Sequence, residues 1–117
     1  KCCLHKAEDA DTGRIYFTNI CCKLLDKEQG RCTNYAERHS FVPDCVRLTP
    51  ALLDEIPWLP KSCAYRLRHE GRVLPDWHYL ISGDRESVHR AGESVRGWTV
   101  DEDDGLDWEE HLVEHEI

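Results

Sequence analysis

The chain contains 117 residues, which suits one domain and is too short for two ordinary ones. Leu, Ile, Val and Phe make up about 22% of the residues while 32% are charged, so the hydrophobic core must be thin. No apolar run approaches the roughly 18 residues of a membrane-spanning helix, and no signal peptide is visible. Seven cysteines and four tryptophans nevertheless argue against a disordered chain.

Charged residues are distributed unevenly along the chain. Residues 101–117 carry nine acidic side chains and no Lys or Arg, whereas residues 1–100 are nearly neutral. We therefore predict a domain over 1–100 that holds the cysteines, followed by an acidic segment over 101–117 with a short helix. That segment is either solvated or contacts a basic partner.

The predicted elements follow local start and stop signals. Thr49 and Pro50 supply an N-cap and a first helical proline, and Gly71 supplies a left-handed stop. Asp107 and Glu110 form a capping-box pattern. In chain order, the sequence predicts a strand over 14–20, helices over 50–56, 63–70 and 84–92 and a weak strand over 94–100. A predicted terminal helix starts at 107 and carries Trp108 and Leu112 on its apolar side.

The cysteines all lie in the first 63 residues; they are Cys2, Cys3, Cys21, Cys22, Cys32, Cys45 and Cys63. Three interpretations remain open: a disulfide framework, unrelated buried thiols, or thiolate ligands of zinc or an iron–sulfur cluster. The chain contains no Cys-x-x-Cys knuckle, which is the strongest zinc signature. Because successive side chains of an extended chain face opposite ways, one thiol of each vicinal pair would face a given site.

We predict a small α-rich, irregular α+β domain with short strands, stapled by a cysteine-ligated metal site. Because a thin core supplies little stability, the metal would contribute folding free energy and would be mainly structural. Reduced thiols fit the cytoplasm and the mitochondrial matrix equally.

Several stretches resemble a known family, the YcgN-like group of the YkgJ-type cysteine-cluster (CxxCxxCC) proteins, which chelate zinc or iron. The resemblance covers roughly residues 1–100 in one register. The most specific matching stretches are Cys2-Cys3-Leu4-His5-Lys6, Cys32-x-x-Tyr35-x-x-Arg38, Pro43-Asp44-Cys45, Trp58-Leu59-Pro60, Cys63-Ala64-Tyr65-Arg66-Leu67 and Ser82-Gly83-Asp84.

The resemblance implies a metal-chelating cysteine cluster of unproven biochemical role. The expected ligands are Cys2, Cys3, Cys22, Cys32, Cys45 and Cys63. Relatives normally open with a Cys-x-x-Cys-Gly-x-Cys-Cys run, so we expect this chain to be truncated at its N-terminus. Gly30 stands where the family has a further cysteine. Either Cys21 replaces that ligand, or the metal site is degenerate.

Histidines and basic residues give weaker signals. His5 lies two residues from Cys3 and could complete a mixed shell, whereas His111 and His115 have a zinc-compatible i,i+4 spacing without the glutamate of a protease motif. Lys61, Arg66, Arg68 and Arg72 form a local basic excess that lacks the aromatic interleaving of a nucleic-acid module, so nucleic acid is an unlikely partner.

Whether the chain is an enzyme stays undecided, since it has no Gly-rich nucleotide loop and no nucleophile elbow. The alternative function is a non-enzymatic subunit or assembly factor of a larger complex with a degenerate metal site. A protein partner would bind through Trp98 and the acidic segment, because exposed aromatic side chains anchor interfaces.

Overall fold

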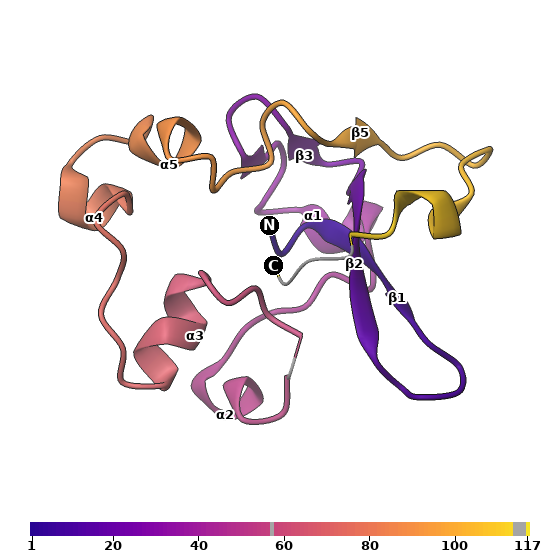
Figure 1. The fold of residues 1–117 in the computed structure, drawn as a ribbon, viewed down its shortest axis with the longest axis horizontal. Coiled ribbons are helices and arrows are strands. Elements are labelled where there is room, and N and C mark those ends of the chain that lie inside the picture. Colours follow the sequence, from indigo (N-terminus) through magenta and orange to yellow (C-terminus); the bar gives the residue numbers. More distant parts are fainter. Residues whose placement is uncertain (57, 114–116) are drawn as a thin grey trace.

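A β-hairpin and a series of very short helices make up the structure. It is a computed structural model, and it describes residues 1–56, 58–113 and 117. Figure 1 shows the hairpin and β5 on one side of the molecule, α2 to α5 on the other, and both termini between them. No helix of the described residues is both long and apolar enough to cross a membrane.

The elements are short and closely spaced along the chain. The strands are β1 (Leu4–Glu8), β2 (Ile15–Cys21), β3 (Leu25–Asp26), β4 (Arg31–Cys32) and β5 (Val100–Asp101). The α-helices are α1 (Arg38–Phe41), α2 (Pro50–Leu53), α3 (Ala64–His69), α4 (Tyr79–Ser82) and α5 (Ser87–Arg90), and a 3-10 helix, η1, covers Trp108–His111.

The main sheet has the strand order β1-β2-β5. β1 and β2 are antiparallel, and the register places Leu4 opposite Cys21 and Glu8 opposite Ile15. β5 lies parallel to β2, with Val100 opposite Ile20. β2 is rich in β-branched and aromatic residues, which explains its strand conformation. β3 and β4 form a separate two-stranded antiparallel sheet.

The core is small and lies beside the hairpin. Leu4, Cys21 and Val95 form a buried cluster, against which Trp98 packs while remaining partly exposed. Thr18 is also fully buried, and its hydroxyl donates a hydrogen bond to the His5 carbonyl at 2.8 Å. Buried hydroxyl groups are normally hydrogen-bonded, and this bond joins β2 to β1 in the interior of the hairpin.

The predicted α-rich, metal-stapled fold is wrong. Of the described residues, only 23% are helical and about 17% lie in strands. Most of the α-helices are four residues long because prolines and left-handed glycines interrupt the chain, as at Gly71 and Gly83. Within the described residues, no group of three His, Cys, Asp or Glu side chains is placed to hold a metal ion, so the expected staple is not seen.

The acidic segment lies on the hairpin. After β5, an isolated bridge joins Thr18 to Leu112, and the Val113 N–H donates to the Phe17 carbonyl at 2.8 Å. At the end of the chain Ile117 is buried, and its carbonyl accepts a hydrogen bond from the Lys61 N–H at 2.8 Å. The segment therefore packs on the body, while the proposed boundary at residue 100 stays a prediction.

Candidate metal centre and adjoining cleft

Three cysteines gather at one end of the hairpin. Beyond the Leu4–Cys21 pair, the Cys22 N–H donates to the Cys3 carbonyl at 2.9 Å, which places Cys3 next to Cys22. The Cys3 thiol donates a hydrogen bond to the Cys2 sulfur, and Cys22 is near enough to influence Cys3 electrostatically. We call Cys2, Cys3 and Cys22 the thiol group.

The pKa values of the two vicinal thiols, Cys2 and Cys3, are shifted in opposite directions. The hydrogen bond from Cys3 stabilises the Cys2 thiolate and lowers the pKa of Cys2 from 9.0 to about 5, although partial desolvation of the thiol by neighbouring atoms opposes the shift. The same hydrogen bond, reinforced by burial and by the Cys2 charge, raises the pKa of Cys3. The pair therefore holds one thiolate and one thiol at neutral pH.

Lys6 is a cation close to this pair. Its ammonium donates to the carbonyls of Cys2 and Leu4, at 2.8 Å each, and lies over the ring of Trp58. Burial lowers the pKa of Lys6, and the two thiols oppose that shift. Sequence reasoning did not give Lys6 a role, although it ends the matching stretch Cys2-Cys3-Leu4-His5-Lys6.

The other four cysteines are dispersed. Cys21 is fully buried in the core, and Cys32 lies in β4 opposite Leu25. The Cys45 carbonyl is bonded by the His39 ring at 2.7 Å. Cys63 precedes α3 and lines a cleft that Cys2 also lines.

The fit of a metal is therefore partial. Thiolates are the donors that zinc and iron–sulfur centres prefer, so the chemistry of the thiol group suits either metal. A closed zinc site needs four ligands, however, and the described residues do not assemble even a three-residue site. By itself, the thiol group does not make a complete coordination shell for either metal.

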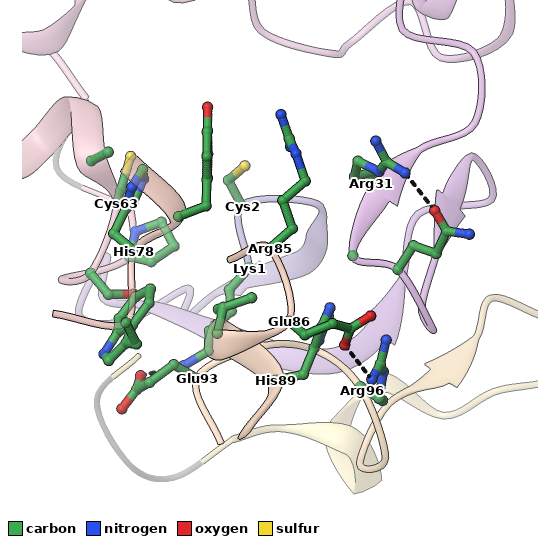
Figure 2. A pocket seen from close by; sticks show the side chains of 18 of the residues that line it. Lys1, Cys2, Arg31, Cys63, His78, Arg85, Glu86, His89, Glu93 and Arg96 are labelled. Carbon is green, nitrogen blue, oxygen red and sulfur yellow. Dashed lines mark hydrogen bonds and ion pairs between the residues drawn. The ribbon is translucent and has the colours of Figure 1, made fainter. Parts of the chain in front are cut away.

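A cleft of about 720 Å³ opens beside the thiol group. Figure 2 shows Cys2, Cys63 and His78 among the side chains that border it, with Arg85 extending next to Cys2 in this view. Its walls come from four separate parts of the chain, namely residues 1–2, residues 28–31, residues 60–64 and residues 77–96. Because these parts are distant in sequence, their meeting is a property of the tertiary structure.

The described histidines make hydrogen bonds or ion pairs. His5 pairs with Glu102, and its ring lies 5.1 Å from that of Trp108 at a tilt of 39°. His111 bonds Asn19 at 2.8 Å, and its proposed zinc-binding companion, His115, lies outside the described residues. In the cleft wall, His89 bonds Ser94 at 2.8 Å.

Comparison with known proteins identifies the class. Residues 1–64 match the family model CxxCxxCC, described as "Putative zinc- or iron-chelating domain". The chain belongs to this family of zinc- or iron-chelating cysteine-cluster proteins.

Curated relatives carry only a family label. A UPF0260 protein of Rhizorhabdus wittichii is 61% identical over 117 residues, which is 100% of this chain and 80% of the relative. A UPF0260 protein of Rhodobacter capsulatus is 58% identical, over 97% of this chain and 78% of the relative. A Pseudomonas aeruginosa relative with the same label is 54% identical, over 96% and 76%. No solved structure matches the chain significantly.

Alkylation of the metal-free protein should report the Cys2 thiolate. Because the pKa of Cys2 is lowered to about 5, we expect Cys2 to react with iodoacetamide at an undiminished rate down to about pH 6, and to slow as pH falls through about 5. Peptide mass spectrometry across a pH series measures this rate. In Cys3→Ala the stabilising hydrogen bond is gone, so the onset should move towards pH 9. A rate for Cys2 that rises only above about pH 8 in the unmodified sequence would contradict the assignment.

Proposed function

We propose that this protein chelates one zinc or iron ion through the thiol group, as a YcgN-like member of the YkgJ-type cysteine-cluster proteins. The observation that carries the proposal is the contact between Cys2 and Cys3, with Cys22 beside them. It supplies a preformed thiolate next to a second thiol, which is the donor chemistry that the family description requires.

The remaining ligands come from the other cysteines of the expected set. Cys63 is the best placed, because it lines the same cleft as Cys2. Cys32 and Cys45 would approach as the metal binds, since metal binding commonly couples to local folding. Cys21 packs against Leu4 and Val95, which supports a role in the core rather than a role as substitute ligand.

The metal's structural role is local in this proposal. The Leu4 cluster and the β1-β2-β5 sheet are complete without it. Cys2 is exposed, so a metal there is accessible to solvent and to chelators. Binding would order the start of β1 and its junction with Cys22, while the core keeps its own stability.

Metal content tests the proposal directly. We expect protein purified without oxygen to contain about one zinc or iron per chain by elemental analysis. An absorption spectrum separates colourless zinc from a coloured iron–thiolate centre. The variants Cys3→Ser and Cys22→Ser should each lose most of the metal because each lacks one thiolate ligand. Chelator treatment of the unmodified sequence should remove the metal without abolishing the cooperative unfolding transition.

Cys21→Ala is the matched control. It removes a thiol of the same hairpin that lies in the core, so we expect normal metal content and a lower free energy of unfolding. Absence of metal from the anaerobic protein, or retention of full metal content in both Cys3→Ser and Cys22→Ser, would overturn the proposal.

A second candidate is the non-enzymatic subunit or assembly factor. α4 favours it, because Leu80 is 66% and Ile81 is 55% exposed on consecutive positions of one short helix. Trp98 is partly buried against the core, which leaves it less surface for a partner than the sequence suggested. A folded chain that contains no metal in the same elemental analysis would favour this role. A cytoplasmic location and a mitochondrial matrix location suit this role equally.

A further inference from the structure

The Lys, Arg and Glu side chains of the cleft beside the thiol group comprise four cations and three anions, and the Cys2 thiolate adds a fourth anion. Lys1 pairs with Glu93 at 3.3 Å, and Arg96 pairs with Glu86 at 3.1 Å. Arg96 also contacts the third cleft glutamate, Glu28, at 3.8 Å. The acidic side chains of the cleft are thus already engaged.

Two arginines of the cleft have no carboxylate partner among the described residues. Among the described residues, no carboxylate lies within 4.0 Å of the guanidinium of Arg31 or of Arg85. Both border the cleft, Arg31 from β4 and Arg85 from the loop between α4 and α5. Figure 2 shows Arg85 extended beside Cys2, with Arg31 farther away on the other side of Arg85. A guanidinium without a counter-charge next to a cavity is a ready partner for an anion.

Arg85 is held in place without using its donors. Its guanidinium lies 4.4 Å from the centre of the Tyr79 ring, and that ring is stacked on His78 at 4.8 Å. His78 is fixed in turn because its Nδ1 accepts a hydrogen bond from the Leu80 N–H at 3.2 Å. Stacking engages only the face of a guanidinium, so the N–H groups at its edge stay available for a ligand.

Arg31 is positioned by one hydrogen bond. Its Nη2 donates to the Gln29 side-chain oxygen at 2.6 Å. Since a guanidinium has five N–H donors, this contact fixes its direction and leaves the remaining donors to the cleft.

We propose that the cleft binds a small organic oxyanion, a carboxylate or a phosphate, through Arg31 and Arg85. The volume of about 720 Å³ lies within the range of small-molecule sites. Glu28, Glu86 and Glu93 in the walls would repel the continuous backbone of a nucleic acid, whereas one compact anionic group needs only the two unpaired guanidiniums. This site goes beyond metal chelation and does not require that the thiol group be loaded.

Calorimetric titration with citrate and with pyrophosphate tests the site, on the protein as purified. We expect saturable binding of at least one anion, weakening with salt because the contacts are charged. Citrate alone would identify a carboxylate ligand, pyrophosphate alone a phosphate ligand, and either result supports the oxyanion site. Arg85→Gln and Arg31→Gln should each weaken binding about tenfold or more. Both arginines are exposed, so the variants should fold, and melting curves check this.

Arg14→Gln is the matched control, because Arg14 also lies over a tyrosine ring, Tyr16, at 4.8 Å, but does not line the cleft. We expect it to bind like the unmodified sequence. Cys3→Ser separates this inference from the metal proposal, since it should lose metal yet keep anion binding. The inference is overturned if neither anion binds, if Arg14→Gln weakens binding as much as Arg85→Gln, or if anion binding disappears with the metal in Cys3→Ser.

Discussion

Replacing Leu4 by alanine is expected to lower the free energy of unfolding by about 3 kcal/mol, within the usual range for a buried leucine. Leu4 is 1% exposed and packs against Cys21 and Val95 at the centre of a core with few members. A domain of this size has a stability of roughly 5–15 kcal/mol, so the loss is a large fraction of the total. Urea unfolding followed by circular dichroism measures it.

Leu80→Ala is the control for that substitution. The change in side chain is the same, but Leu80 is 66% exposed, so its effect should stay within about 0.5 kcal/mol. Equal destabilisation by the two variants would show that the Leu4 cluster is not the centre of the core.

Removing residues 100–117 is expected to destabilise the protein by about 3 kcal/mol or more, since it exposes several apolar side chains and one sheet edge. The deletion removes β5, the bridge from Leu112 to Thr18 and the buried Ile117. It also uncovers β2, which carries the most deeply buried positions of the sheet. Thermal melting and urea unfolding of the shortened chain check the result.

The control for the deletion separates charge from packing. Asp103→Asn with Asp104→Asn removes two exposed negative charges and keeps the chain in place, so stability should hardly change. If the deletion behaves like this double variant, the segment is a solvated acidic tail and its packing on β2 contributes nothing measurable.

Local signals in the sequence predicted several elements correctly. The strand expected over 14–20 corresponds to β2, and Thr49 caps α2 through a hydrogen bond from the Leu52 N–H at 3.2 Å. The helix expected over 63–70 is α3, followed by the predicted left-handed Gly71. These elements depend on propensity and capping, which act over a few residues and can be read from the sequence.

Pairing partners were not predictable in the same way. β1 has no β-branched residue, and it is a strand because β2 lies beside it. The weak strand expected over 94–100 is reduced to the two residues of β5, since only Val100 and Asp101 meet β2. The terminal helix is a single 3-10 turn, although Asp107 caps it as expected by accepting from the Glu109 N–H at 3.0 Å.

The sequence by itself determined the family and the kind of chemistry, because clustered cysteines and long matching stretches are properties of the chain order. Only the tertiary structure decided which thiols meet, since Cys3 and Cys22 are brought together by the hairpin register. It also decided that Cys21 is a core residue and that Arg31 and Arg85 border one cleft. Contacts between distant residues depend on how short elements pack, and no local pattern encodes that packing.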